Sequence, residues 1–442
     1  MRSNYRRIED FIQLVDERNK DLKIDRLLGL SITKEFIPSV ANTVGANMKN
    51  YKIIRKNQFA CSIMQVRRDK KMPVAILKDY DEAIISQAYP VFRVVDETKL
   101  LPDYLMMWMR REEFDREACF LAVGGVRGSL EWEDFLNMEL PVPPIEKQRE
   151  IVAEYNTVVD RIELNEQINQ KLEETAKAIY RYWFEEFEFP ISKEYAESIG
   201  KPELEGKPYK SSDGEMVYNQ ELEEEIPKGW ERISIQDLID RNLIHPNRDG
   251  NHGELHPKSS DYVDQGIPFI MANDIVNSAI DFENCKFIPK EISDNLRIPP
   301  SKKGDVLITH KGTMGRVTIV PEIDIPIVLT PQVTFYRVKQ KKKITKEFLY
   351  GYFKSSKFQQ KLISESDQST RKYLGITKQR LFKLILPIEE VIQAYSLTVN
   401  EIFSSKNILI NENYKLNSLQ TLLLSKIATT KMEYHDQENL TG

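Results

Sequence analysis

Two polar segments of the chain carry side chains that can bind nucleic-acid phosphates or the edges of bases. Each segment lies between two short apolar runs that are typical of strands, so each is expected to be a loop that joins two strands. Arg, Lys, Asn and Gln are the usual partners of guanine and adenine in the major groove. The candidate residues are Gln65, Arg67, Arg68, Lys70 and Lys71 in the first segment and His310, Lys311, Thr313 and Arg316 in the second. An ordinary hairpin without a ligand is the alternative for both segments.

A second pair of polar loops, residues 124–129 and 368–373, comes later in the sequence. Arg127 and Arg371 match each other, because each is followed three residues later by a leucine and then by a proline-containing corner. Both loops are stronger candidates than the run of three lysines at 341–343, which is typical of a solvated turn. The polar side chains of these loops that could contact a ligand are Arg127, Gln368, Arg371 and Lys372.

Motifs for catalysis on nucleic acids are missing from the sequence. The chain contains no Asn/Asp-Pro-Pro-Tyr/Phe motif for methyl transfer and no glycine-rich loop with a following Lys-Ser/Thr for a nucleotide. A nuclease-like Glu-x-Lys occurs at 205–207, in an acidic stretch with no strand around it. His245, His252 and His256 lie in Pro/Gly-rich surroundings that predict no helix, so surface histidines are expected rather than a metal site. No catalytic residue and no metal ligand is therefore predicted.

Charge is segregated along the chain, although the formal net charge is only −5. Residues 49–71 contain eight Lys/Arg and one acid, and residues 337–383 contain fourteen Lys/Arg and three acids. Residues 185–225 reverse the sign, with thirteen acids and four lysines. Basic blocks inside globular segments suit local anion-binding faces, although such runs are also common on faces that only meet solvent.

Composition places the chain among ordinary globular proteins with two or three domains. It has 442 residues, of which 41% are hydrophobic and 30% charged. No apolar run approaches the roughly 18–20 residues that cross a bilayer, and the N-terminus lacks the apolar core of a signal peptide. The three cysteines, Cys61, Cys119 and Cys285, are expected to be free thiols in a reducing cytoplasm.

The sequence repeats itself with a period near 245 residues, and each copy ends in a long helix. Residues 7–16 resemble 232–240, 91–94 resemble 334–338, and 100–114 resemble 344–358. Each copy is expected to be an α+β domain, with strands at 57–64 and 73–77, or at 305–309 and 316–320. Helices are expected at 102–117 and 345–363.

The two long helices carry apolar seams at alternating steps of four and three residues, the period of a coiled coil. The first seam runs from Ile151 to Trp183 and the second from Tyr395 to Ile427, and Asn165, Asn169 and Asn413 would fix their register. We expect the helices to pair with each other as a spacer of about 55 Å. Two unrelated amphipathic helices on separate cores are the alternative.

Residues 140–152 resemble the start of the central conserved region of type I restriction–modification specificity subunits. Residues 182–190 and 206–231, with Tyr-Trp-Phe-Glu-Glu-Phe at 182–187 and Ile-Pro-Lys-Gly-Trp-Glu at 226–231, resemble the segment that closes that region. The resemblance covers essentially the whole chain. One departure is the second proline corner, Leu386-Pro387-Ile388, which lacks the double proline and the glutamine of the first, so the start of the last helix is left open.

The resemblance implies an α+β fold in which two tandem target-recognition domains are joined by a long antiparallel two-helix coiled coil. The boundaries that follow are 1–143 for the first domain, 144–190 for the central helix, 191–227 for an acidic linker, 228–387 for the second domain, 388–430 for the C-terminal helix and 431–442 for a tail. Each domain would read one half of a bipartite site in double-stranded DNA, in the cytoplasm of a prokaryote and away from membranes. The resemblance also implies that the loops at 124–129 and 368–373 approach the DNA, which makes Arg127, Gln368, Arg371 and Lys372 candidates for DNA contact.

The resemblance also implies partners and excludes cofactors from this chain. Two modification subunits would clasp the helices and supply S-adenosylmethionine-dependent adenine methylation. Restriction subunits, whose presence is left open, would use ATP and Mg²⁺. The helix residues expected to contact these partners are Val152, Val159, Leu164, Tyr180, Phe184, Leu397 and Ile410. The rival hypotheses are a coiled-coil scaffold that binds polypeptide, and an enzyme with its own nuclease or methyltransferase activity.

Overall fold

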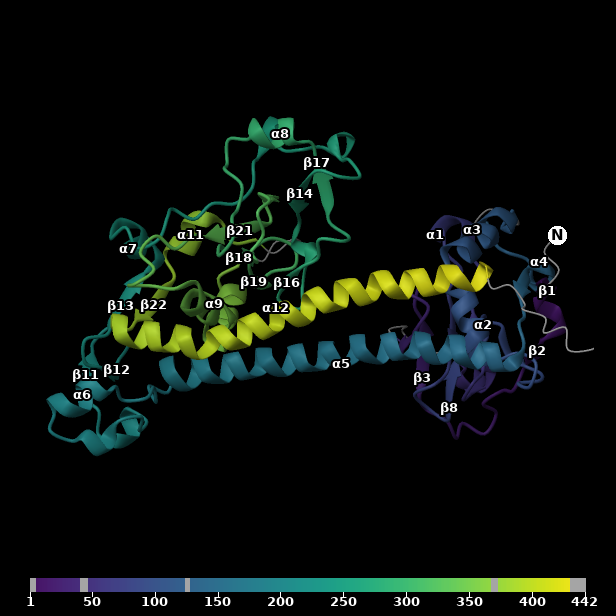
Figure 1. The fold of residues 1–442 in the computed structure, drawn as a ribbon, viewed down its shortest axis with the longest axis horizontal. Coiled ribbons are helices and arrows are strands. Elements are labelled where there is room, and N and C mark those ends of the chain that lie inside the picture. Colours follow the sequence, from purple (N-terminus) through teal and green to yellow (C-terminus); the bar gives the residue numbers. More distant parts are fainter. Residues whose placement is uncertain (1–4, 40–46, 124–127, 367–372, 430–442) are drawn as a thin grey trace, which may run out of the picture. The chain divides into compact units, whose positions relative to one another are not determined.

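The computed structural model describes residues 5–39, 47–123, 128–366 and 373–429. The chain divides into two compact units, and each long helix contributes to both. Unit 1 comprises residues 1–164 and 413–442, and unit 2 comprises residues 165–412. Figure 1 shows the elements of each unit. The domain boundaries expected from the sequence stay a prediction.

Unit 1 contains short strands and helices built on one end of each long helix. Its elements in chain order are β1 (Tyr5–Arg7), β2 (Ile12–Val15), β3 (Leu27–Leu30), β4 (Phe36–Pro38), β5 (Lys52–Arg55), β6 (Phe59–Cys61), α1 (Val66–Asp69), β7 (Val74–Ile76), β8 (Glu82–Ile85), β9 (Val91–Val94), α2 (Pro102–Met109), α3 (Glu112–Leu121), α4 (Trp132–Asn137) and β10 (Glu139–Pro141). Unit 1 also contains residues 145–164 of α5 (Ile145–Phe184) and residues 413–426 of α12 (Glu389–Lys426).

Two four-stranded sheets and one two-stranded sheet organise unit 1. The strand orders are β2-β9-β6-β7, β4-β3-β8-β5 and β1-β10. The main core packs the first of these sheets against α2, α3, α4 and the long helices, with Phe59 stacked on Phe92 at 5.0 Å between ring centroids. Because β1 pairs with β10, the first and last strands of the domain lie side by side.

Unit 2 repeats this plan with additions. Its elements are α6 (Lys193–Ser198), β11 (Met216–Asn219), β12 (Glu224–Pro227), β13 (Glu231–Ser234), α7 (Ile235–Asp240), β14 (Ile267–Ile270), β15 (Ile275–Val276), β16 (Ala279–Ile280), β17 (Lys286–Ile288), α8 (Lys290–Asp294), β18 (Val306–Thr309), β19 (Val317–Ile319), β20 (Val328–Leu329), β21 (Val333–Tyr336), α9 (Lys346–Lys354), α10 (Ser356–Ser364), α11 (Ile376–Arg380) and β22 (Lys383–Leu386). Its sheets have the orders β19-β18-β21, β17-β14-β20, β13-β22, β11-β12 and β15-β16.

The internal duplication is visible in the strand pairing. The order β7-β6-β9 in unit 1 corresponds to β19-β18-β21 in unit 2, and β1-β10 corresponds to β13-β22. The registers agree as well: Cys61 faces Val74 in the first copy, and Ile308 faces Val317 in the second. The two copies are therefore α+β domains with a common core, as the sequence predicts.

The prediction of one continuous helix after the sheet is wrong in both copies. α2 ends at Met109 and α3 begins at Glu112, while α9 ends at Lys354 and α10 begins at Ser356. Ser355 has extended backbone angles, and its hydroxyl accepts a hydrogen bond from the Phe358 amide. A serine in this conformation starts a new helix by satisfying a free amide of the first turn, so it also ends the preceding one. Both helices of each pair bury side chains in the core of their domain.

The helices α5 and α12 pack antiparallel within each unit (Figure 1). In unit 1, Gln420 donates to the Tyr155 hydroxyl at 3.1 Å, and Asn413 donates to the Ile162 carbonyl at 3.4 Å. In unit 2, the rings of Tyr180 and Tyr395 meet at 6.1 Å between centroids. Rising residue numbers on α5 thus meet falling numbers on α12, and the predicted pairing of the two seams is confirmed.

Candidate nucleic-acid interface

The first candidate loop of unit 1 joins β6 to β7 and contains the short helix α1. Gln65 and Lys70 flank α1 with φ of 66° and 54°, so the chain turns sharply on both sides of it. Arg67, Arg68, Lys70 and Lys71 are exposed. The acid within this run, Asp69, binds the Arg68 guanidinium at 2.7 Å. The loop therefore presents more positive than negative charge to solvent, as phosphate binding requires.

The second candidate loop of unit 1 is hydrogen-bonded to the first. The Arg67 amide donates to the Gly128 carbonyl at 3.1 Å, and the Leu130 amide donates to the Ile63 carbonyl at 2.9 Å. Gly128 has a φ of 67°, and a side chain there would collide with the Arg67 side chain. The two loops, predicted separately from the sequence, thus form one surface; Arg127 itself lies outside the described residues.

Unit 2 joins its two candidate loops in the same way. The Leu374 amide donates to the His310 carbonyl at 3.0 Å, and Lys311 and Tyr373 form a β-bridge. Leu374 and Leu130 are the two leucines that the sequence comparison aligned, and both are buried. Gln368, Arg371 and Lys372 lie outside the described residues, so their side chains stay predictions.

His310 is the clearest error among the predicted contacts. Its side chain has no exposed surface, and its Nδ1 lies 2.9 Å from the Leu374 carbonyl oxygen, to which it donates. The Asp249 carboxylate is 3.7 Å from Nε2. Burial lowers the pKa of His310 despite these partners. His310 therefore supports the base of both loops and cannot reach DNA, a role set by contacts distant in sequence.

Arg316 forms hydrogen bonds with the backbone of its own domain. Its guanidinium donates to the Ile275 carbonyl at 2.8 Å and to the carbonyls of Ala272 and Asn273 at 3.4 and 3.3 Å. These bonds hold the turn before β15 against the loop. Lys311 lies 5.7 Å from the centre of the Tyr373 ring, and Thr313 is exposed at the loop tip. Thr313 is exposed and Lys311 and Arg316 are both half-buried, so these three predicted residues of the loop keep surface for a ligand.

Two exposed apolar residues beside the first loop of unit 1 were missed by the sequence reasoning. Phe120 is 81% exposed at the end of α3, and Val123 is 73% exposed just after it. Helix α3 contacts α1 through Cys119, whose thiol lies 3.5 Å from the Val66 carbonyl. Apolar groups at such a place can contact a thymine methyl group. The sequence predicted a helix that ended at residue 117, so no periodicity marked Phe120 as exposed.

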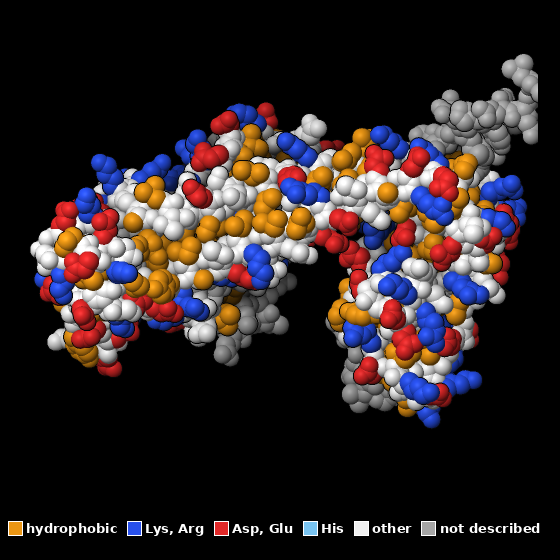
Figure 2. Space-filling model, turned by 60° about the horizontal axis from the view of Figure 1, so that its bottom comes forward, with side chains coloured by type: hydrophobic (Ala, Val, Ile, Leu, Met, Phe, Trp, Pro, Cys, Tyr) orange, Lys and Arg blue, Asp and Glu red, His pale blue; other side chains and the backbone are white. Residues whose placement is uncertain are grey.

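The helix residues predicted to meet partners fall into two groups. Val152, Tyr180 and Phe184 are 9%, 6% and 4% exposed because they belong to the cores of their own units, which corrects their assignment. Leu164 and Leu397 are 46% and 76% exposed, while Val159 and Ile410 are half-buried. Figure 2 shows hydrophobic side chains among the polar ones on the surface of unit 2. Other exposed apolar residues of the long helices are Ile168, Tyr182, Ile408, Leu419 and Leu422.

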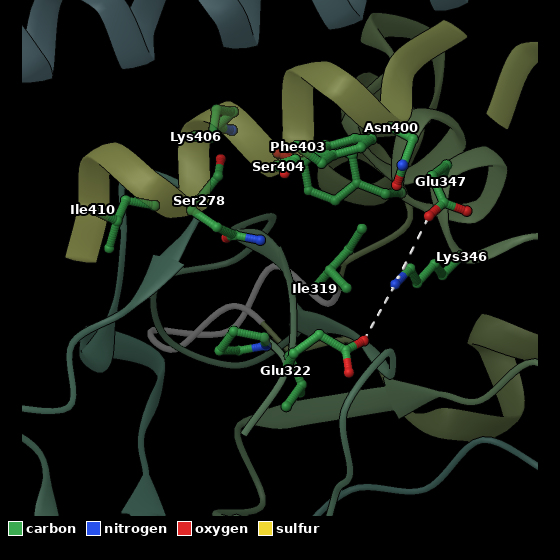
Figure 3. Close-up of a pocket in the computed structure, with 14 residues that line it drawn as sticks. Ser278, Ile319, Glu322, Lys346, Glu347, Asn400, Phe403, Ser404, Lys406 and Ile410 are labelled. Carbon is green, nitrogen blue, oxygen red and sulfur yellow. Dashed lines mark ion pairs between the residues drawn. The ribbon is translucent and has the colours of Figure 1, made fainter. Parts of the chain in front are cut away.

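A cavity of about 220 Å³ lies between α12 and the body of unit 2 (Figure 3). Lys346 lies between Glu322 and Glu347, at 3.9 Å from each, and Phe403 and Ile410 of α12 form the opposite wall. The cavity adjoins the end of β19 that points away from the candidate loop. It therefore forms no part of the candidate interface.

Buried charges join the two long helices to the domain in unit 2. Glu173 binds Lys406 of α12 and, at 3.0 Å, Lys354 of α9, and it accepts from the Tyr350 hydroxyl at 2.7 Å. Burial favours the neutral acid, but the two lysines and the hydrogen bonds outweigh it and lower the pKa of Glu173 to about 2. This cluster fixes the register of the helices against the domain.

Within the described residues, no group of three or more His, Cys, Asp or Glu side chains is arranged to hold a metal ion. All three cysteines are free, as predicted. No described helix has the length and the apolar character needed to span a membrane.

Comparison with known proteins assigns the chain to a family. The family model described as "Type I restriction modification DNA specificity domain" matches residues 6–174 and 227–426. The type I restriction enzyme MjaIX specificity subunit of Methanocaldococcus jannaschii is 21% identical over 338 residues, which are 76% of this chain and 68% of that protein. The HindI specificity subunit of Haemophilus influenzae is 22% identical over 420 residues, covering 85% and 86% of the two chains.

A solved structure shares the fold. The S subunit of a type I restriction–modification system from M. genitalium aligns with a TM-score of 0.52 at 14% identity, over 97% of this chain and 96% of that one. The two matched segments correspond to the two structural copies, each taken together with a long helix. The chain belongs to the type I restriction–modification DNA specificity family, and it is the non-catalytic DNA specificity subunit of such a system.

Proposed function

We propose that each α+β domain reads one half of a bipartite DNA sequence through its pair of joined loops. The observation that carries this proposal is the duplicated hydrogen bond from Leu130 to Ile63 and from Leu374 to His310. Each domain therefore has a surface made of two loops that are joined in the same way. Two such surfaces in one chain suit a DNA site with two halves. Loop sequences differ between the copies, so the two halves would differ in sequence.

The two loops would divide the work between phosphates and bases. The exposed cations of α1, Arg67, Arg68, Lys70 and Lys71, are suited to phosphates, which position a protein without specifying sequence. Arg127 and Arg371, at matched positions of the second loops, are our candidates for bidentate contacts with guanine. The further candidates for polar contact with DNA are Gln65, Lys311, Thr313, Arg316, Gln368 and Lys372.

The long helices would dock two modification subunits, which carry S-adenosylmethionine and methylate adenine. Exposed apolar residues on α5 and α12, Leu164 and Leu397 among them, support this assignment, because a set of exposed apolar side chains along these helices is suited to burial in an interface. Restriction subunits with ATP and Mg²⁺ would complete a restricting complex in the cytoplasm of a prokaryote. Catalysis would thus belong to the partner subunits.

The test is to co-express the chain with the modification subunit of its system and map methylated adenines across a plasmid. A split motif is expected, with Arg127→Ala relaxing one half and Arg371→Ala relaxing the other. The matched controls are Arg7→Ala in unit 1 and Arg241→Ala in unit 2. Both arginines are exposed, lie outside the loops and form ion pairs, Arg7 with Glu9 and Arg241 with Glu231. Methylation at a continuous site, or unchanged without this chain, would favour the scaffold hypothesis.

A further inference from the structure

Each domain has a polar side chain on its second helix that binds the backbone of the first candidate loop. In unit 1, the Asp115 carboxylate of α3 accepts a hydrogen bond from the Met72 amide at 3.0 Å. In unit 2, the Gln359 side-chain amide of α10 donates to the Gly315 carbonyl at 3.0 Å. Both bonds reach the end of the loop, just before the strand that leaves it.

These two side chains occupy the same position in the duplicated domain. Asp115 directly follows Phe114, and Gln359 directly follows Phe358, the phenylalanine aligned with it. Their partners also correspond. Met72 lies two residues before Val74, and Gly315 lies two residues before Val317, where β7 and β19 begin.

The correspondence extends to the end of the preceding helix. In unit 2, Gln359 also donates to the Phe353 carbonyl at 2.6 Å. In unit 1, the equivalent carbonyl, that of Met109, accepts instead from the ammonium group of Lys34, which binds Asp115 at 2.8 Å. The last turn of a helix has free carbonyls that need a donor. One amide in unit 2 does what a carboxylate–ammonium pair does in unit 1.

The side chains that make these contacts are partly or almost wholly withdrawn from solvent. Asp115 and Lys34 are 7% and 5% exposed, and Gln359 is half-buried. Burial lowers the pKa of Lys34, and the Asp115 carboxylate partly offsets that effect. In unit 2, Gly315 has a φ of 82°, and the Gln359 amide fills the space that any side chain at 315 would need. The loop end is thus confined in both domains, by different chemistry at one position.

We propose that Asp115 with Lys34, and Gln359, are positioning residues that hold the first loop of their own domain, and through it the second, base-reading loop that is hydrogen-bonded to it, in the binding conformation. The inference rests on the proposed function, because it assigns those loops to reading. We call the contacts of these residues the clamp of each domain: Asp115 with Lys34 in unit 1, and Gln359 in unit 2. Polar contacts specify a base only when donor and acceptor are correctly placed. Loosening one clamp should therefore lower discrimination between base pairs in one half of the site and leave the other half unaffected.

The test compares charge-matched variants of the full chain in complex with its modification subunit. Lys34→Met with Asp115→Ala removes the clamp of unit 1 without leaving a buried charge. Lys34→Met with Asp115→Asn keeps an acceptor for the Met72 amide. In unit 2, Gln359→Met removes both donors, and Gln360→Met, at the exposed neighbouring position, is its control. The readout is the ratio of methylation rates on plasmids with the intact site and with one base pair changed in either half.

We expect the K34M/D115A variant to lose about tenfold discrimination in one half only. The K34M/D115N variant should recover most of it, and Q359M should lose discrimination in the opposite half while Q360M matches the parent. The clamp is overturned if K34M/D115A and K34M/D115N discriminate equally, or if either clamp variant weakens both halves alike. A parent complex that methylates no split motif would instead contradict the proposed function, whatever the variants do.

Discussion

Glu173 of α5 and Lys406 of α12 form an ion pair inside unit 2, and Lys354 of α9 and the Tyr350 hydroxyl bind the same carboxylate. One acid therefore connects both long helices to the second domain. Removing one partner from a buried ionic cluster lowers the free energy of unfolding by more than the whole cluster adds to it, because the remaining buried charges are no longer compensated.

Replacing Glu173 with Gln should destabilise unit 2 most at neutral pH. The folded pKa of about 2 lies below the ordinary value of 4.5, so the carboxylate contributes full stability above about pH 5 and loses it as the pH falls towards 2. That difference corresponds to about 3 kcal/mol. Urea unfolding at several pH values should show a flatter acid limb for E173Q than for the parent. E174Q, at the exposed neighbouring position, is the control and should follow the parent curve.

Replacing Arg67 and Arg68 with Ala should weaken DNA binding at low salt more than at high salt. Each lost phosphate contact lowers the slope of log affinity against log salt by about 0.9. We expect a slope reduced by about 1 to 2, measured by titrating the assembled complex with duplex DNA at several salt concentrations. Loss of affinity with an unchanged slope would argue that these arginines do not contact phosphates.

Two glycines of the β18–β19 loop provide a matched pair. Gly312 and Gly315 have φ of 77° and 82°, so alanine is strained at both, but only at Gly315 does the Gln359 side chain fill the space for a Cβ. G312A should cost about 1 kcal/mol of unfolding free energy. G315A should cost more and should also relax one half of the methylated motif. Equal effects of the two substitutions would show that Gln359 moves aside freely.

Replacing Leu397 with Glu should reduce association with the modification subunit and leave the fold intact, because this side chain is 76% exposed. We expect a loss of about tenfold or more in affinity, measured by titrating purified subunits, with an unchanged melting temperature of the chain alone. L397M keeps an apolar surface and is the control. An L397E chain that binds as tightly as L397M would remove this part of α12 from the interface.

Much of the fold could be predicted because segments of the first copy resemble segments of the second copy in the same order along the sequence, which indicates a duplicated domain. The strands β6, β7, β18 and β19, the two long helices and their pairing all follow from hydrophobic periodicity. Periodicity did not reveal the break at Ser355, because a single cap residue outweighs the apolar pattern around it.

The candidate site was less predictable than the fold. The sequence identified both loop pairs but could not show that His310 is buried, because its surroundings come from Leu374 and Asp249, which are distant in sequence. Lys34 belongs to the clamp only through Asp115, 81 residues later, and no motif connects them. The same polar residue types support a loop or contact a ligand. Only the burial of each side chain, which the structure shows, distinguishes the two roles.

The two copies differ in how much chain lies between matched anchor points. Twelve residues separate Cys61 from Val74, and eight separate Ile308 from Val317, yet the paired strands keep the same register. A loop held at both ends by the strand pair, the leucine amide and the clamp can change in length and content without altering the core beneath it. The domain is therefore suited to rapid divergence. The loop between the paired strands can be replaced to recognise a new DNA sequence, while the core residues that govern folding and assembly are kept.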